Sequence, residues 1–223
     1  MADAARRRGR HPRQHGPMAC WPPLPCPGCG RRPAVEGGAC ADCWRAIDRA
    51  PHPAGPWLVA WGTYRGPLGR LVRAAKYRPS AALLRALGAR LGAHAGARWP
   101  DFCRAAAVVP VPPDTGRRRR RGVDHTGLLA AAVAAALPHP RPHRPMLRRN
   151  RPTRPQSLLP SERREANLRG AFDLRLAHGE RAAGGVLLVD DVSTSGATLR
   201  ACRAALLAAG ATEVRAAVVA RAR

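Results

Sequence analysis

The sequence predicts an α/β fold in which a doubly wound, mostly parallel sheet follows a small cysteine module. Two observations indicate this fold: strand-like apolar runs alternate with helix-like segments from residue 57 onward, and four paired cysteines precede them. A chain of 223 residues can bury one sizeable core and carry one small appendage. We therefore expect three parts: a disordered basic arm (1–20), the cysteine module (21–50) and a main domain (57–223).

The N-terminal arm is rich in Arg, His, Pro and Gly and contains almost no apolar residues, which is typical of disordered segments. It is not followed by the apolar stretch and cleavage site of a secretory signal. No segment of the sequence approaches the roughly 20 apolar residues that a membrane span requires. We therefore expect a cytoplasmic protein without membrane insertion.

The formal net charge is +25, from 39 Lys and Arg against 14 Asp and Glu, and Lys76 is the only lysine. One interpretation is an electrostatic surface for phosphate-bearing partners, because guanidinium groups bind phosphate oxygens in pairs. The other is a compositional bias toward Ala, Arg, Gly and Pro. That bias explains the choice of Arg over Lys, but it does not explain the size of the excess.

The cysteine module contains two C-x-x-C pairs separated by ten residues. Four thiolates in two close pairs are a typical ligand set for tetrahedral structural zinc. A redox site fits less well, because two pairs occur together and lie away from a βαβ unit. The spacing therefore predicts a zinc ribbon with the ligands Cys26, Cys29, Cys40 and Cys43.

The first half of the main domain alternates strand and helix patterns. Residues 57–64 are β-prone, and leucines at helical spacing follow in 68–75 and 83–91. The short apolar run 105–111 ends in a proline turn and predicts a strand. After an arginine-rich loop, a helix is expected over 126–137.

The second half begins with residues 138–160, which are dense in Pro and Arg, have no periodicity and predict a long mobile loop. The unbroken apolar run 185–189 predicts a buried strand. A helix over 195–209 ends before Gly210, and 214–220 predicts the last strand. Ligands of doubly wound sheets bind at the carboxyl ends of strands, so the site should lie where such a strand ends.

Asp190 and Asp191 follow the buried strand directly, and a turn of small hydroxylic residues then enters a helix. Backbone N–H groups at a helix N-terminus bind anions, and Thr194, Ser195 and Thr198 can add hydroxyl donors. Two adjacent carboxylates would repel a phosphate, but they suit a neutral diol or a nearby metal ion. Ribose 5-phosphate offers a diol and a phosphate in one ligand.

Two further kinds of site fit this stretch less well. An apolar strand ending in two aspartates also occurs in P-loop nucleotidases, whose Gly-rich loop carries a lysine followed by Ser or Thr. Here the lysine, Lys76, lies in the sequence AAKYR instead. An ordinary capped strand-to-helix turn accounts for one or two of these residues but not for the whole string.

The string LLVDDVSTSGAT at 187–198 closely resembles the phosphoribosyl-pyrophosphate (PRPP) motif of type I phosphoribosyltransferases. The order of the surrounding features resembles the ComF competence-protein family over roughly residues 26–221. These features are the cysteine pairs, Tyr64-Arg65-Gly66, Lys76-Tyr77, the Val-Pro-Val-Pro turn at 109–112, Arg121-Gly122, Gln156, Arg164, Asn167 and Gly170-Ala171-Phe172. The resemblance implies a type I phosphoribosyltransferase-like domain with an N-terminal zinc ribbon.

The resemblance also implies roles for individual residues. Asp190 and Asp191 would contact the ribose 2- and 3-hydroxyls, Mg²⁺ would accompany PRPP, and a mobile loop at 148–164 would close over the site. The implied PRPP-binding residues are Ser193, Thr194, Ser195, Gly196, Ala197, Thr198, Val111, Arg121 and Arg164. Only one helix and one strand follow the motif, so a hood over the acceptor would come from residues before about 105.

Two positions depart from the family's pattern. Val123-Asp124-His125 stand where Phe-Asn-Gln is typical, and Ser195 stands where threonine is commoner. The expected function is PRPP or ribose 5-phosphate binding, with an unidentified acceptor if the protein is an enzyme, linked to DNA uptake or nucleotide metabolism. The alternative is a non-catalytic factor that handles single-stranded DNA and keeps the pocket as a sensor or relic. In either case, the run Arg117 to Arg121 would bind substrate, DNA or neither.

Overall fold

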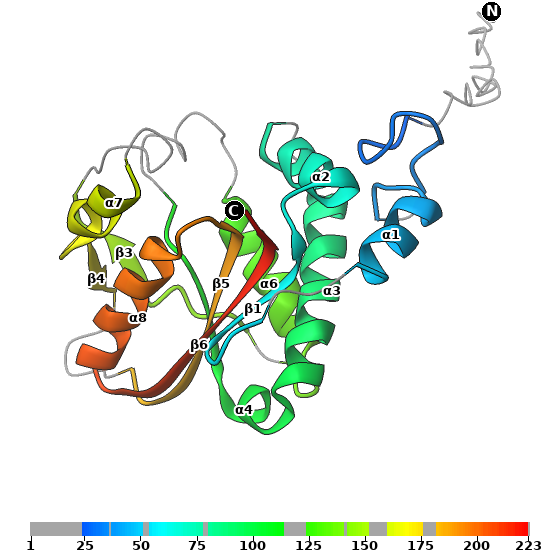
Figure 1. The fold of residues 1–223 in the computed structure, drawn as a ribbon. Helices are drawn as coiled ribbons and strands as arrows, with labels where there is room; N and C mark the ends of the chain where they lie inside the picture. Colours follow the sequence, from blue (N-terminus) through cyan, green and yellow to red (C-terminus); the bar gives the residue numbers. More distant parts are fainter. Residues whose placement is uncertain are drawn as a thin grey trace, which may run out of the picture.

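The computed structural model describes residues 24–35, 37–50, 54–77, 80–113, 124–140, 142–151, 160–175 and 182–222. The centre of the molecule is a four-stranded parallel sheet in the order β1-β6-β5-β2 (Figure 1). Its strands are β1 (Leu58–Thr63), β2 (Ala107–Pro110), β5 (Gly184–Ser193) and β6 (Ala211–Arg221). The predicted α/β fold with a mostly parallel sheet is confirmed.

Helices cover both faces of this sheet, so the fold is doubly wound (Figure 1). Alternate side chains of β5 point to opposite faces, because successive residues of a strand alternate. Leu187 and Val189 enter one apolar core, while Val186 and Leu188 enter the other. The first core lies against α2 (Gly66–Tyr77), α3 (Ala81–Arg98), α4 (Pro100–Ala105) and α6 (His125–Ala136). The second lies against α8 (Ala197–Ala208).

Helices α3 and α6 pack closely because α3 presents glycines to α6. A Cβ atom at Gly88 would lie 2.5 Å from the Cβ of Ala132, and one at Gly92 would lie 2.6 Å from the carbonyl oxygen of Val133. The missing side chains therefore bring the two helix backbones together.

The expectation of a long structureless loop over 138–160 is wrong in part. Strand β3 (Leu147–Arg149) pairs antiparallel with β4 (Phe172–Leu174), and α7 (Ser161–Leu168) lies between them in the chain. The strand pair forms because Leu147 and Phe172 bury their side chains in the second core. This burial stabilises the strand pair, although strands of three residues are too short to show an alternating pattern.

The cysteine module continues into α1 (Ala41–Asp48), which packs against the first core. Trp44 of α1 meets Trp61 of β1 with ring centroids 6.1 Å apart, and the Arg90 guanidinium stands 4.1 Å over the Trp44 ring. Figure 1 shows the module beside α2 and α3, away from α8. The module and the main domain therefore share one apolar core.

The other predicted elements occur close to their expected positions. The last helix starts at Ala197 instead of 195, and the last strand starts at Ala211 instead of 214. The basic arm at 1–20 and the run Arg117 to Arg121 lie outside the described residues. Within the described residues, no helix has the length and apolar character needed to cross a membrane.

Candidate functional site

The end of β5 carries the acidic pair. The strand is buried through Val189 and then reaches the carboxyl edge of the sheet, where Asp190 and Asp191 are half-buried. The backbone N–H of Asp191 donates a hydrogen bond of 2.8 Å to Oδ1 of Asp190, which fixes that carboxyl group beside its own strand. Both predicted carboxylates thus lie at the edge where parallel α/β sheets bind ligands.

The pKa of Asp190 departs strongly from its ordinary value. Burial, reinforced by the neighbouring Asp191 carboxylate, raises the pKa of Asp190 to about 7. The backbone N–H of Asp191 and the charges of Lys76 and Arg149 act in the opposite direction. A carboxyl group with such a pKa changes charge near neutral pH, which is common at functional sites.

The turn after β5 is shaped for close approach by an anion. Gly196 precedes α8 with a φ of 76°, a left-handed conformation that favours glycine. The hydroxyl of Ser195 accepts a hydrogen bond of 3.4 Å from the N–H of Ala197. Ser193 Oγ is buried, has no hydrogen-bond partner among the described residues and lies 3.9 Å from where a Cβ of Gly196 would be. A buried hydroxyl beside helix N–H groups suits a bound anion.

The six residues expected at the phosphate follow one another through this turn into the first turn of α8. They are Ser193, Thr194, Ser195, Gly196, Ala197 and Thr198. Thr194 is exposed and Thr198 is half-buried. Their role in phosphate binding stays a prediction.

Val111 lies directly beside the acidic pair in space. It follows β2, and its N–H donates a hydrogen bond of 2.9 Å to the carbonyl oxygen of Val189. Its side chain is buried in the second core, so its backbone and the following prolines form the neighbouring rim of the site. The structure therefore brings together the Val-Pro-Val-Pro turn at 109–112 and the carboxyl end of β5.

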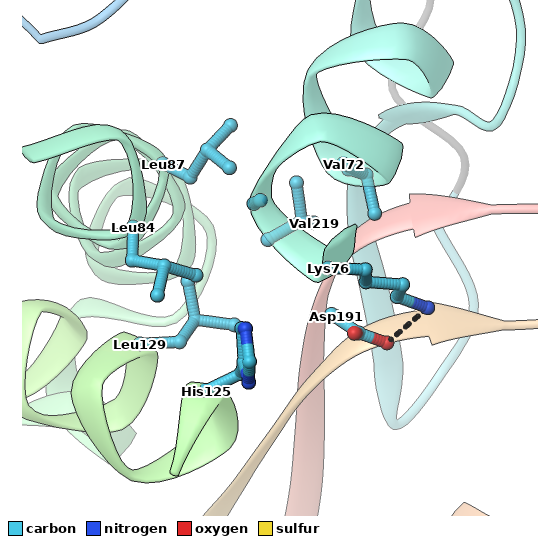
Figure 2. Close-up of a pocket in the computed structure, with 9 residues that line it drawn as sticks. Val72, Lys76, Leu84, Leu87, His125, Leu129, Asp191 and Val219 are labelled. Carbon is cyan, nitrogen blue, oxygen red and sulfur yellow. Dashed lines mark ion pairs between the residues drawn. The ribbon is translucent and has the colours of Figure 1, made fainter. Parts of the chain in front are cut away.

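Lys76 completes this edge from a distant part of the sequence. Its Nζ lies 3.0 Å from Oδ1 of Asp191, as Figure 2 shows. The ion pair borders a small pocket. Apart from this pair and the ring of His125, the side chains that line the pocket are aliphatic. The pocket is lined by Val72, Ala75, Lys76, Leu84, Leu87, His125, Leu129, Asp191 and Val219. Sequence reasoning did not place Lys76 in the site, although its status as the only lysine was a usable signal.

The structure describes two residues of the stretch Val123-Asp124-His125, which departs from the family's pattern. Asp124 caps α6, because its carboxylate accepts a hydrogen bond of 2.9 Å from the N–H of Gly127. His125 is buried and faces the pocket from the first turn of α6 (Figure 2). Val123 lies outside the described residues.

The expected site includes two arginines whose side chains lie outside what the structure describes. Arg121 lies outside the described residues. Arg164 belongs to α7, but its side chain is outside what the structure describes. A different arginine, Arg149 on β3, stands 5.1 Å over the ring of Phe172 and lowers the pKa of Asp190 by its charge. Sequence reasoning assigned Arg149 only to a mobile loop and missed this position.

The four predicted metal ligands converge in the N-terminal module. All four Sγ atoms lie within 4.8 Å of one another, with Cys26 and Cys43 separated by 3.8 Å and Cys29 and Cys40 also by 3.8 Å. Tetrahedral zinc with Zn–S bonds of about 2.3 Å places its sulfurs about 3.8 Å apart. The four sulfurs are therefore close enough together to hold one tetrahedral zinc ion.

Backbone N–H groups stabilise two of these sulfurs, those of Cys26 and Cys29, as thiolates. The N–H of Gly28 lies 3.3 Å and that of Cys40 lies 3.2 Å from the Cys26 sulfur. Hydrogen bonds from the N–H groups of Arg31 and Arg32 lower the pKa of Cys29 to about 6. Arg70 of α2 donates from Nε to the carbonyl oxygen of Gly28 at 2.5 Å, which joins the cysteine loop to the main domain.

Comparison with known proteins agrees with this architecture. The family model for a phosphoribosyl transferase domain matches residues 131–223, which include β5, the turn and α8. The DNA utilization protein YhgH of Escherichia coli K12 is 31% identical over 198 residues, covering 85% of this chain and 80% of that protein. Competence protein F of Haemophilus influenzae is 28% identical over 191 residues, covering 85% and 81% respectively.

Proposed function

Because this chain belongs to the ComF competence-protein family, we propose that it binds PRPP or a related ribose 5-phosphate ligand at residues 187–198. One observation carries the proposal: two carboxyl groups end a buried strand beside the buried hydroxyl of Ser193, which has no hydrogen-bond partner in the described part of the chain. A pentose phosphate would offer its diol to the carboxyl acceptors and its phosphate to the hydroxyl and backbone N–H donors.

The two ends of the ligand would meet different chemistry. The carboxylates of Asp190 and Asp191 would accept hydrogen bonds from the ribose 2- and 3-hydroxyls. The 5-phosphate would lie at the N-terminus of α8, where backbone N–H groups and the helix dipole favour an anion. Gly196 has no side chain to obstruct that approach.

The same geometry suits transfer of the phosphoribosyl group. Transfer breaks the anomeric C–O bond, so positive charge develops on the sugar ring while the pyrophosphate leaves with its negative charge. Carboxylates beside the ring would stabilise that positive charge. Mg²⁺ would enter with PRPP on its pyrophosphate oxygens, beside the turn that contains Val111. No protein nucleophile is required.

The N-terminal cysteines would hold a structural zinc ion through Cys26, Cys29, Cys40 and Cys43. A closed set of four thiolates leaves no open coordination position for catalysis. Zinc would stabilise the fold of the module and its contact with α2. Reduced cysteines of this kind suit a cytoplasmic location, which we also propose.

Binding is tested by isothermal titration calorimetry with PRPP and with ribose 5-phosphate. Asp190→Asn combined with Asp191→Asn should abolish measurable binding, because an amide group is a weaker acceptor and carries no charge. The matched control is Asp48→Asn with Asp101→Asn, which changes the net charge equally at two exposed positions. Unchanged affinity of the first double variant would refute the proposed site.

A second candidate is handling of single-stranded DNA, with or without catalysis. The net charge of +25 favours it, as do the names of the relatives, which refer to DNA utilization and competence. Phosphate contacts would make such binding weaken steeply with salt. Pyrophosphate release from PRPP, screened across bases, amines and ammonia, separates a transferase from a factor that only binds.

A further inference from the structure

The pair formed by Lys76 and Asp191 lies inside the proposed ribose site, although its two members are distant in sequence. Nζ of Lys76 and Oδ1 of Asp191 are 3.0 Å apart, and the side chains are only 21% and 24% exposed. Aliphatic side chains of α2, α3, α6 and β6 line the pocket that the pair borders (Figure 2). Restricted contact with water strengthens an ion pair relative to one on an open surface.

The position of Lys76 is fixed by the helix that carries it. Lys76 lies in the last turn of α2, and that helix buries Leu71, Val72 and Ala75 in the first core. The buried face determines where the next residue along the helix projects. The ammonium group is therefore held at the carboxyl edge by packing that precedes any ligand.

The residue type is also informative. The chain uses arginine at every basic position except this one. An ammonium group is a compact charge with three donors, whereas a guanidinium group is a wide planar fork, so the two are not interchangeable in a narrow site. One donor of Lys76 serves Asp191, and two remain for other acceptors.

We propose that Lys76 is the fixed cation of the ribose site, which orients the Asp191 carboxylate and donates to a ribose hydroxyl, so that ribose 5-phosphate binds without a divalent cation. This inference rests on the proposed function and adds a residue to its site. Ribose 5-phosphate, which has no pyrophosphate, should then bind independently of Mg²⁺.

The test uses the zinc-loaded full chain and ribose 5-phosphate in calorimetry, with and without Mg²⁺ and without a chelator that would strip the cysteines. Wild type should show the same affinity in both buffers. Lys76→Met should bind at least about tenfold more weakly, the usual effect of losing a charged hydrogen bond. Added Mg²⁺ should restore part of that loss, because it can take the place of the ammonium at Asp191.

Two variants distinguish the role of Lys76 from general charge or folding effects. Arg73→Met removes one charge from an exposed position of the same helix and should change affinity less than about twofold. Lys76→Arg keeps the charge and should not recover wild-type affinity, because the fork does not fit the position. Melting temperatures by circular dichroism show that each variant is folded.

Three results would overturn the inference. One is Lys76→Met binding ribose 5-phosphate within about twofold of wild type, and another is a wild type that needs Mg²⁺ for this ligand. The third is a loss that Mg²⁺ does not change and that accompanies a lower melting temperature, which would identify a purely structural ion pair. If wild type bound neither ribose 5-phosphate nor PRPP, the proposed function would fall together with the inference.

Discussion

The environment of Asp190 and its proposed contact with ribose favour opposite protonation states of its carboxyl group. Burial at the end of β5 and the neighbouring Asp191 carboxylate raise the pKa of Asp190 to about 7. A ribose hydroxyl, however, donates best to an ionised carboxylate. The residue is therefore in its ligand-binding charge state only above its own pKa.

This conflict predicts a pH dependence of binding. The affinity for ribose 5-phosphate should rise between about pH 6 and pH 8, because Asp190 loses its proton as the pH passes through about 7. Calorimetry across this range measures the effect. The second ionisation of the phosphate also lies near pH 6, so the Asp190→Asn variant is the control for that contribution.

The Asp190→Asn variant should lack the part of the pH dependence that comes from ionisation of Asp190. Asp190→Asn should bind weakly, with an affinity that follows the phosphate ionisation alone. Equal pH profiles for this variant and wild type would show that Asp190 does not titrate in the free protein. A fall in wild-type affinity from pH 6 to pH 8 would contradict the proposed hydroxyl contact.

Among the residues of the candidate site, the sequence predicts those that lie in one contiguous motif. Asp190 and Asp191 are recognisable because strand, carboxylates and turn are contiguous. Lys76 reaches Asp191 only through the packing of α2 on the sheet, so no spacing in the sequence relates the two. The place of Arg149 was missed for the same reason, because its strand β3 forms only by pairing with the distant strand at 172–174.

At the scale of elements, α3 and α6 form the support of the pocket. Gly92 on α3 faces the backbone of α6, and a Cβ there would lie 2.6 Å from the Val133 carbonyl oxygen and 2.9 Å from the Ala136 Cβ. Neither atom can move away alone, because each is part of a helix in the core. The close contact therefore depends on the absence of a side chain at this position.

The substitution Gly92→Ala tests this contact. Helix propensity alone would stabilise the protein by about 1 kcal/mol, but overpacking typically destabilises by about 1–3 kcal/mol. We expect a net loss of stability of about 1 kcal/mol in urea unfolding. Ala93→Gly, at the exposed neighbouring position, measures the propensity difference without the clash. A Gly92→Ala variant as stable as wild type or more stable would contradict the close packing.

The elements that sequence patterns missed are the short ones. Strands β3 and β4 each contain three residues, too few for an alternation to be recognised. Their pairing is determined by burial of Leu147 and Phe172 against α8 and the sheet. Longer elements such as α3 and β5 show periodicity or an unbroken apolar run, and they were predicted.

At the scale of the whole molecule, α2 joins the two candidate sites. Arg70 on this helix contacts the carbonyl oxygen of Gly28 in the cysteine loop, and Lys76 near its end contacts Asp191. Trp44 and Ile47 of the module lie in the same core as the sheet. The module is thus part of the structural support of the main domain, as well as an N-terminal appendage.

This shared core predicts the effect of metal removal. The purified protein should contain about one zinc per chain, and chelation should lower the melting temperature of the whole molecule in a single transition. The reason is that loosening the four cysteines exposes Trp44 and Ile47 and so weakens the first core. Differential scanning calorimetry measures the transition, and metal analysis measures the zinc content.

Variants extend this test beyond the chelator. Cys29→Ser should reduce both zinc content and melting temperature, because it removes a half-buried ligand without opening a large cavity. Cys103→Ser changes a buried cysteine outside the cluster and should leave the zinc content unchanged. Added zinc should restore the chelated wild type. Two separate melting transitions, with the main one unchanged by chelation, would mean that the module is not needed to stabilise the sheet.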